Sequence, residues 1–495
     1  LDVVSAGANV AMTAGEYKIG VSGASLGLIV SASGKALEAK GGVYAQLGGD
    51  VDLSAANAAI MWKEGATVLT GANKTLTVGA LTYTFGDEIV SSTGIEEVRI
   101  SGAVLNVADF FRVSGNFAFH KSSGALKPSV GAEIQADILT LGASNLDIFA
   151  GINGGMEDAM GLALSGASFA LALMSDKNNS SRRWTALKAS AGSAGIVGID
   201  DVTLTGSAME VAVNLKASDG TVIDFSQDAM QVATGVNESV TLNFQDALVQ
   251  ASGTLEIGVA DYFNVSGGFA FKKSAGSVTL NTGDQVAVDL LTIGGSHISA
   301  FAGLNGGSAD ALGLALSDTD FALVIAGDKL DTQRSWISLK ASSGSVGFAG
   351  IDGITLSADS MNVEINRAGT DKDGNRSVID YKADALEVAT SSSSSVTVDM
   401  DGQEGELIRA SGSLHLNLFN FFSVGGSFAF EKKSATVTVT DTANASRNVA
   451  VDFLTLGGAD ISAFAGMNGG SSDELGLKLS GVDFALVLAA DKLNA

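Results

Sequence analysis

The sequence predicts an all-β protein, an elongated repeat array of long, bent antiparallel strands. Bulky apolar residues alternate with small or polar ones over long runs such as residues 313–329, and a period of two is typical of a strand with one buried face. This run has two further copies, at residues 161–177 and 476–492. Polar turn residues separate the runs, and no helical period lasts more than a couple of turns. Sequential strands are therefore expected to pair as antiparallel hairpins.

A second marker gives the length of the repeat. The motif Phe-Ala-Gly-x-Asn-Gly-Gly begins at Phe149, Phe301 and Phe464, so its copies start 152 and 163 residues apart. Such a period is typical of architectures in which each unit packs on its neighbours. We expect the end of a truncated repeat at 1–25, three repeat units at 26–168, 169–320 and 321–483, and the start of a further repeat at 484–495. The chain is accordingly expected to be a piece of a longer protein.

A shorter motif within the repeat predicts that the strands bend. Four residues separate two alternating runs, so the chain shifts sideways in mid-strand, as it does at a β-bulge. The copies of this motif are residues 204–211, 225–232, 356–363 and 381–388. Long, bent strands are the expected result. The pattern leaves open whether they wind as a β-solenoid or run as a meander that curls into a rod.

Side-chain size differs between the two faces of each expected strand. Ala, Gly and Ser occupy one face of residues 313–329. We expect the other, bulky face to form a buried core between stacked repeats, where burial of one phenylalanine contributes about 1.5 to 3 kcal/mol. Trp184 and Trp336, at equivalent positions, are expected to anchor the core. The bulky residues of this run are Leu314, Leu316, Phe321, Leu323 and Ile325.

Composition excludes several classes of function. The 54 acidic residues outnumber the 29 basic ones, and a net charge of −25 repels nucleic acid and anionic lipid headgroups alike, so neither is an expected partner. The absence of cysteine excludes disulfides, zinc thiolates and thiol catalysis. The sequence has no run of about 18 apolar residues, so we expect no membrane-spanning helix.

The repeat itself tests the three histidines as catalytic residues. His120 matches Lys272 in the next unit and His415 matches Glu256, and His297 is likewise replaced in the neighbouring units. Positions that exchange histidine for other polar residues are expected to be solvated. No nucleophile elbow, phosphate loop or zinc-binding helix motif occurs in a fitting context. The chain is therefore predicted not to be an enzyme.

One polar segment is a candidate cation site. Asp371, Asp373 and Asn375 place three side-chain oxygens around Gly374, and such an arrangement suits calcium. A complete calcium loop would need a later bidentate glutamate, which this segment lacks. The alternative is a charged hairpin turn. Calcium is the only cofactor that the sequence suggests.

Pairs of aromatic residues recur once per repeat, at 110–111, 262–263 and 421–422. We expect these pairs to pack in the core or between repeat units. The alternative is an exposed apolar groove that accepts a lipid or another strand.

Two tandem blocks carry a resemblance to a known class of proteins. Their patterns are Phe-x-Val-Ser-Gly-x-Phe-Ala-Phe, as at 111–119, and Gly-Leu-Ala-Leu-Ser-x-x-x-Phe-Ala-Leu, as at 161–171. Over essentially its whole length the chain resembles the tandem repeat regions of giant secreted bacterial surface proteins, the large repetitive exoproteins and adhesins. The resemblance implies an extracellular or cell-surface location and a scaffold or adhesive role, and it carries over no catalytic residue.

Two functions agree with these patterns. The first is a non-enzymatic structural or adhesive segment of a large bacterial surface protein, which forms a rod or fibre by stacking β repeats and self-associates with further copies. The alternative is an apolar β-groove that binds or conducts lipid. A dry core packed with Phe and Leu would favour the first function, and a continuous open apolar face would favour the second.

Overall fold

The computed structural model describes residues 1–14, 17–46, 51–107, 111–153, 156–157, 159–198, 202–235, 237–259, 262–305, 310–350, 353–391, 393–440 and 446–491. Over these residues the fold is all-β, as predicted, with one short α-helix. The chain forms two compact units. Unit 1 comprises Leu1–Asp200 and Thr205–Val249, and unit 2 comprises Asp201–Leu204 and Gln250–Ala495.

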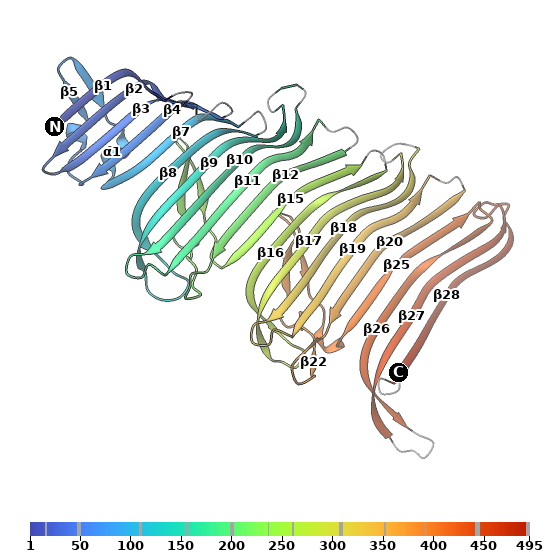
Figure 1. Ribbon diagram of the computed structural model, residues 1–495. Coiled ribbons are helices and arrows are strands. Elements are labelled where there is room, and N and C mark those ends of the chain that lie inside the picture. Colours follow the sequence, from blue (N-terminus) through green and yellow to red (C-terminus); the bar gives the residue numbers. More distant parts are fainter. Residues whose placement is uncertain are drawn as a thin grey trace. The chain divides into compact units, whose positions relative to one another are not determined.

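Long antiparallel strands that lie side by side and curve along their length make up unit 1 (Figure 1). Each pairs with the next long strand along the chain, so the sheet is a meander. The long strands of unit 1 are β1 (Asp2–Ala14), β2 (Tyr17–Ser31), β3 (Gly34–Gln46), β4 (Val51–Glu64), β7 (Gly94–Val107), β8 (Phe111–Leu126), β9 (Ile134–Ile152), β10 (Met160–Asp176), β11 (Arg183–Val197) and most of β12 (Val202–Leu215).

Unit 2 has the same plan. Its long strands are most of β15 (Leu248–Val259), then β16 (Phe263–Thr279), β17 (Gln285–Leu304), β18 (Leu312–Asp328), β19 (Ser335–Ala349), β20 (Ile354–Arg367), β25 (Leu407–Leu418), β26 (Phe422–Thr440), β27 (Ser446–Met467) and β28 (Leu475–Asp491). From β16 to β28 each long strand pairs antiparallel with the next one.

Three shorter segments between long strands fold over the sheet, and we call them lids. Lid 1 (65–93) lies between β4 and β7, lid 2 (216–247) between β12 and β15, and lid 3 (368–406) between β20 and β25. Lid 1 contains η1 (Gly71–Asn73), β5 (Thr75–Val78), β6 (Leu81–Thr84) and α1 (Asp87–Ser91). Lid 2 contains the hairpin β13 (Met230–Gly235) and β14 (Glu238–Leu242). Lid 3 contains β21 (Gly369–Thr370), β22 (Arg376–Ser377), β23 (Leu386–Ala389), β24 (Ser395–Val398) and η2 (Gly402–Glu404).

The lids cover the small-residue face of the long strands and so form the core. Ala322, Val324 and Ala326 of β18 are buried beneath lid 3, in one cluster with Val388 of β23. Comparable clusters include residues of lids 1 and 2. The expectation that the bulky face forms the core is therefore wrong. That face, on which Phe321 is only partly buried, is the one that the lids leave uncovered.

Close approach of the lids explains why this face needs small residues. A β-carbon on Gly294 would lie 2.1 Å from the carbonyl oxygen of Ala389 in lid 3, and one on Gly142 would lie 2.0 Å from that of Ala233 in lid 2. Such distances leave no room for a side chain, so the lid backbone lies directly on the sheet. A larger residue at either glycine would push the lid away from its strand.

The long strands bend at irregularities in mid-strand. The register shifts beside Gly115, Gly267 and Gly426, whose φ angles are 150° to 152°. Ala208 and Ser360 have φ angles of 50° and 55° and lie within the predicted bend motifs at 204–211 and 356–363, which confirms these two bends. The bends predicted at 225–232 and 381–388 are wrong, because these residues belong to lids 2 and 3.

Two tryptophans attach lids 2 and 3 to the sheet. Trp184 and Trp336 are both about 1% exposed, which confirms their predicted role in the core. The indole Nε1 of Trp184 donates a hydrogen bond to the carbonyl oxygen of Thr221 at 3.1 Å, and that of Trp336 donates to the carbonyl oxygen of Ser377 at 2.9 Å. Each indole therefore combines a large buried apolar surface with a fixed hydrogen bond to the lid.

A buried ion pair lies beside each tryptophan, as unit 2 illustrates. Asp328 accepts hydrogen bonds from Arg334 Nε at 2.8 Å and from the backbone N–H of Leu330 at 2.8 Å. The Arg334 guanidinium also lies 5.1 Å from the ring centroid of Trp336. Burial alone would raise the pKa of Asp328, but the N–H of Leu330 and the Arg334 side chain outweigh it and lower the pKa below its ordinary value.

Asp328→Asn is expected to destabilise unit 2 at neutral pH by about 2 kcal/mol, because charged hydrogen bonds are lost. A carboxylate whose pKa is lower in the folded than in the unfolded state stabilises the fold at pH values above its unfolded pKa, about 3.9. This stabilisation is lost as the pH falls through the folded-state pKa. The variant should therefore show a flatter loss of stability than the wild type below about pH 4. Urea midpoints by circular dichroism from pH 3 to 7 test this, with the exposed Asp373→Asn as control. Parallel pH profiles for Asp328→Asn and the wild type would contradict it.

Candidate functional site

In each unit the face of the long strands away from the lids is apolar, and we call it the apolar face. Rows of directly paired residues cross it from strand to strand, and every member is partly or largely exposed. The row in unit 1 is Ile60, Val98, Phe119, Leu141, Leu171, Leu187 and Val213. The row in unit 2 is Phe271, Ile293, Leu323, Leu339, Ile365 and Ile408.

The bends turn the apolar face inward. Ala143 lies two residues beyond Leu141 on the same face of β9, and it is fully buried although no lid covers it. Its neighbours in the buried cluster come from the long strands alone, Leu146, Phe117 and Phe169 among them. Side chains on the two sides of the bend therefore lean toward each other, and the apolar face forms a trough.

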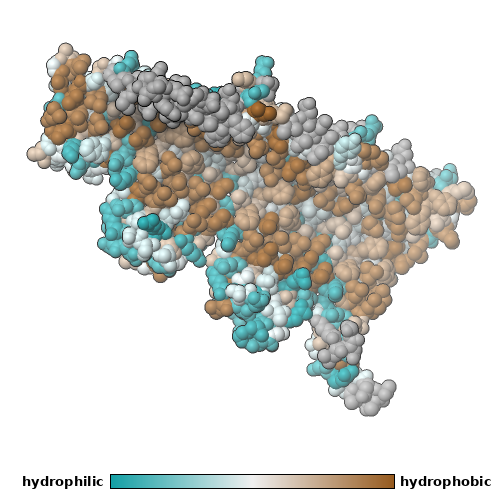
Figure 2. Space-filling model, in the orientation of Figure 1, coloured by the Kyte–Doolittle hydropathy of each residue, from teal (hydrophilic) through white to brown (hydrophobic). Residues whose placement is uncertain are grey.

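The trough is open to solvent on both sides of the bends. Phe119 and Phe271 expose 42% and 39% of their surface, and Leu314, beyond the bend of β18, exposes 55%. Hydrophobic residues cover much of the long strands in Figure 2, and polar residues gather at strand ends. Soluble monomers rarely expose apolar patches of more than a few hundred Å², so a face of this kind is typical of a binding surface.

The recurring aromatic pairs are exposed as well. Tyr262, Phe263 and Phe421 all belong to the exposed large hydrophobic residues. Their expected place in the core is therefore wrong, and their exposure agrees with the alternative of an apolar groove. Phe110 and the side chain of Phe111 lie outside the described residues.

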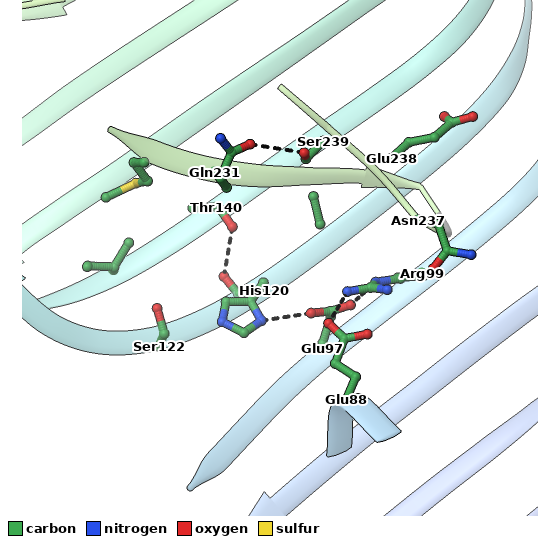
Figure 3. A pocket seen from close by; sticks show the side chains of 13 residues that line it. Glu88, Glu97, Arg99, His120, Ser122, Thr140, Gln231, Asn237, Glu238 and Ser239 are labelled. Carbon is green, nitrogen blue, oxygen red and sulfur yellow. Dashed lines mark hydrogen bonds and ion pairs between the residues drawn. The ribbon is translucent and has the colours of Figure 1, made fainter. Parts of the chain in front are cut away.

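A polar pocket lies on the lid-bearing face of unit 1 (Figure 3). Its volume is about 510 Å³, and residues of β7–β9, lid 2 and α1 line it. The carboxylate of Glu97, which is 2% exposed, pairs with the Arg99 guanidinium and lies 2.9 Å from His120 Nδ1. Arg99 also pairs with Glu88 of α1.

These contacts attach lids to the sheet. Burial alone would lower the pKa of Arg99, but Glu97 and then Glu88 raise it, so the guanidinium stays charged. Glu238 of lid 2 accepts hydrogen bonds from Asn116 Nδ2 and Ser144 Oγ of the sheet. The charged groups of the pocket thus hold one another in place, which favours a structural role over acid–base chemistry.

A counterpart of this cluster lies in unit 2. Arg409 of β25 pairs with Glu364, Glu404 and Glu431. Glu404 belongs to η2 near the end of lid 3, as Glu88 belongs to α1 near the end of lid 1. The sequence patterns did not predict either cluster, although both arginines begin an Arg-x-Ser-Gly sequence in the aligned repeats.

The predicted calcium ligands lie in the turn of the hairpin β21–β22. Asp371 accepts hydrogen bonds from the backbone N–H of Asp373 at 2.9 Å and of Asn375 at 2.8 Å. The side-chain amide of Asn375, the largest cause, and these N–H groups lower the pKa of Asp371. Asp373 pairs with Lys372 at 2.6 Å. In the described part of the chain, no three His, Cys, Asp or Glu side chains are grouped to hold a metal. Calcium at this turn stays a prediction, which calorimetric titration can test.

The histidines are not brought together. His297 and His415 are exposed, as solvated strand positions should be. His120 differs, because it is partly buried and contacts the buried carboxylate of Glu97. Because the next repeat has lysine at the position of His120, the sequence predicted a solvated side chain there and did not predict this contact.

No family model matches the chain, and a search of curated proteins gives no match. Among the described residues, no helix has both the length and the apolar character required to cross a membrane.

The repeat offers a test of the Glu97 cluster. Leu248 and Gln250 stand where the first repeat has Glu97 and Arg99. We expect Glu97→Leu alone to destabilise unit 1 by about 3 kcal/mol, because it leaves a buried Arg99 without its nearest counter-charge. Glu97→Leu combined with Arg99→Gln should recover at least half of that loss. Urea denaturation measures both variants, and a single variant as stable as the wild type would refute a role in lid attachment.

Proposed function

We propose that the chain is a non-enzymatic β-repeat segment whose trough binds the hydrocarbon chains of lipids. The observation that carries the proposal is the pair of exposed apolar rows, one in each unit, that run from strand to strand across the face away from the lids. Removal of apolar surface from water contributes roughly 25 cal/mol per Å². A partner that covers these rows is therefore strongly favoured.

A lipid chain suits this face better than a second copy of the protein. Packing two apolar faces together would bring two chains of net charge −25 into contact, and like charges oppose such an association. A hydrocarbon chain carries no charge along its length. The buried Ala143 and Leu146 support the same view, because the bend already shields part of the trough from solvent with residues of the long strands alone.

The repeated plan of the chain supports an array that extends the trough. Among the described residues, six long strands followed by one lid occur as β7–β12 with lid 2 and as β15–β20 with lid 3. In this proposal the array is a curled antiparallel meander that forms a rod, and each further repeat lengthens the apolar face. An extracellular or cell-surface location is part of the proposal and rests on the resemblance to repetitive surface proteins.

A structural or adhesive segment is the second candidate, and the repeated plan of long strands and lids favours it. Repeats of one plan that pack on their neighbours suit a rod or fibre that spans distance. Electron microscopy across a range of concentrations separates the two functions: fibres that lengthen with concentration support the second candidate, and single particles count against it.

Protein purified without detergent is expected to carry acyl lipids, which solvent extraction and mass spectrometry would identify. Ile293→Ser combined with Leu323→Ser should reduce the bound lipid at least tenfold, because both positions lie in the exposed row of unit 2. Leu330→Ser is the matched control, because Leu330 is 94% exposed and lies outside the row. Equal amounts of lipid in the double variant and the wild type would contradict the proposal.

A further inference from the structure

A lysine stands at the same place on the apolar face in each repeat. Lys121, Lys273 and Lys432 follow Phe119, Phe271 and Phe430 by two residues, so each shares the face of its phenylalanine. On the next strand each lysine pairs directly with a leucine, namely Leu139, Leu291 and Leu454. The side chains of one cation, one exposed aromatic ring and one leucine thus recur together three times.

These lysines are available to a ligand. All three are exposed. Lys121 lies 2.9 Å from Glu96, but both side chains are more than half exposed, and a pair of this kind contributes at most about 1 kcal/mol. Lys273 and Lys432 make no ion pair with any described residue. The nearby acid Asp289 on β17 already faces Lys329 at 3.5 Å.

We infer that the ligand of each repeat is a long-chain fatty acid, an inference that rests on the proposed lipid-binding function. Its carboxylate binds the lysine, and its chain runs along the strand toward the bend. In an acidic protein, a cation at one end of an apolar surface is the charge that complements an anionic headgroup. The bound acyl chain would cover the phenylalanine and leucine and exclude water from that side of the ion pair, which strengthens the lysine–carboxylate attraction relative to an open surface pair.

The dimensions agree with an acyl chain. Lys273 lies six positions along the strand from the bulge glycine Gly267, a distance of roughly 20 Å at about 3.3 Å per residue. One leaflet of a bilayer is about half of the ~30 Å hydrocarbon core, so an acyl chain spans roughly 15 Å. Phe271 and Phe269 of β16 and Ile293 of β17 line this path. The chain would thus cover most of the path from the lysine to the bend.

The spacing of the lysines favours a single carboxylate over a larger headgroup. Within unit 2, Lys273 lies on β16 and Lys432 on β26, six strands further across the sheet. This separation is about 29 Å at ~4.8 Å per strand. Each binding position therefore offers one cation of this set. Phosphate sites typically use the bidentate fork of arginine or several donors, which one lysine does not supply.

The test compares palmitate with hexadecanol, which has the same chain length and no charge. Both are titrated into the full, delipidated chain and followed by displacement of a fluorescent apolar probe. The variant carries Lys121→Gln, Lys273→Gln and Lys432→Gln. We expect its affinity for palmitate to fall about tenfold and its affinity for hexadecanol to stay unchanged. The control variant has Lys74→Gln, Lys372→Gln and Lys382→Gln, which removes equal charge from the lids and should bind both ligands as the wild type does.

Other outcomes overturn the inference in distinguishable ways. If palmitate binds the variant and the wild type with equal affinity, the lysines do not bind the carboxylate. The apolar trough would then remain a binding site for the hydrocarbon chain alone. If the wild type binds neither ligand, the proposed lipid-binding function fails as well. Lysine-dependent binding to vesicles of anionic phospholipid, without binding of palmitate, would reject a fatty acid in favour of a phosphate headgroup.

Discussion

The contact between each lid and the small-residue face of the strands determines which side of the sheet is buried. Glycine and alanine let the lid backbone lie directly on the sheet, since a β-carbon on Gly294 would lie only 2.1 Å from the carbonyl oxygen of Ala389. The lid then supplies the Val, Tyr and Met side chains that fill the core with Trp336. The lids thus bury the small-residue face, and no described segment covers the row of bulky residues on the opposite face in either unit. The sequence pattern is that of an ordinary amphipathic sheet, but the large apolar residues face outward and the small ones face the core.

The mid-strand bends give that outward face its form. Glycines with φ near 150° lie opposite a branched side chain of the neighbouring strand, and a β-carbon on Gly267 would lie 2.4 Å from Ile298 Cδ1. The same device occurs at Gly115 and Gly426. The bend converts a flat apolar surface into a trough, and the charge clusters around Arg99 and Arg409 hold the lids behind it. The core under the lids and the apolar face that we propose as the lipid-binding surface therefore lie on opposite faces of the sheet.

Period-two alternation and repetition were enough to predict an all-β fold of long, bent antiparallel strands, and positive φ angles at Ala208 and Ser360 confirm two of the bends. The buried face could not be predicted, because alternation shows that two faces differ and does not show which one another segment covers. Lids 2 and 3 contain the stretches 225–232 and 381–388, whose match to the bend motif predicted long strands. The Glu97–Arg99–His120 contacts depend on strand register across β7 and β8, which no local pattern encodes. The lysine after each Phe-Ala-Phe-x was visible in the sequence, but its meaning depends on knowing that the adjoining face is open.

The openness of the apolar face is the central claim, and the lack of cysteine in the chain allows a direct measurement of it. Single cysteines at Leu323 and at Val324 place one thiol on each face of β18, at neighbouring positions. After delipidation, Leu323→Cys should react with a thiol reagent at nearly the rate of a free cysteine, and Val324→Cys, beneath lid 3, should be strongly protected. Fatty acid should slow only the reaction at Leu323→Cys. Equal protection of both thiols in the lipid-free chain would contradict the account, because it would show that the apolar face is covered in solution.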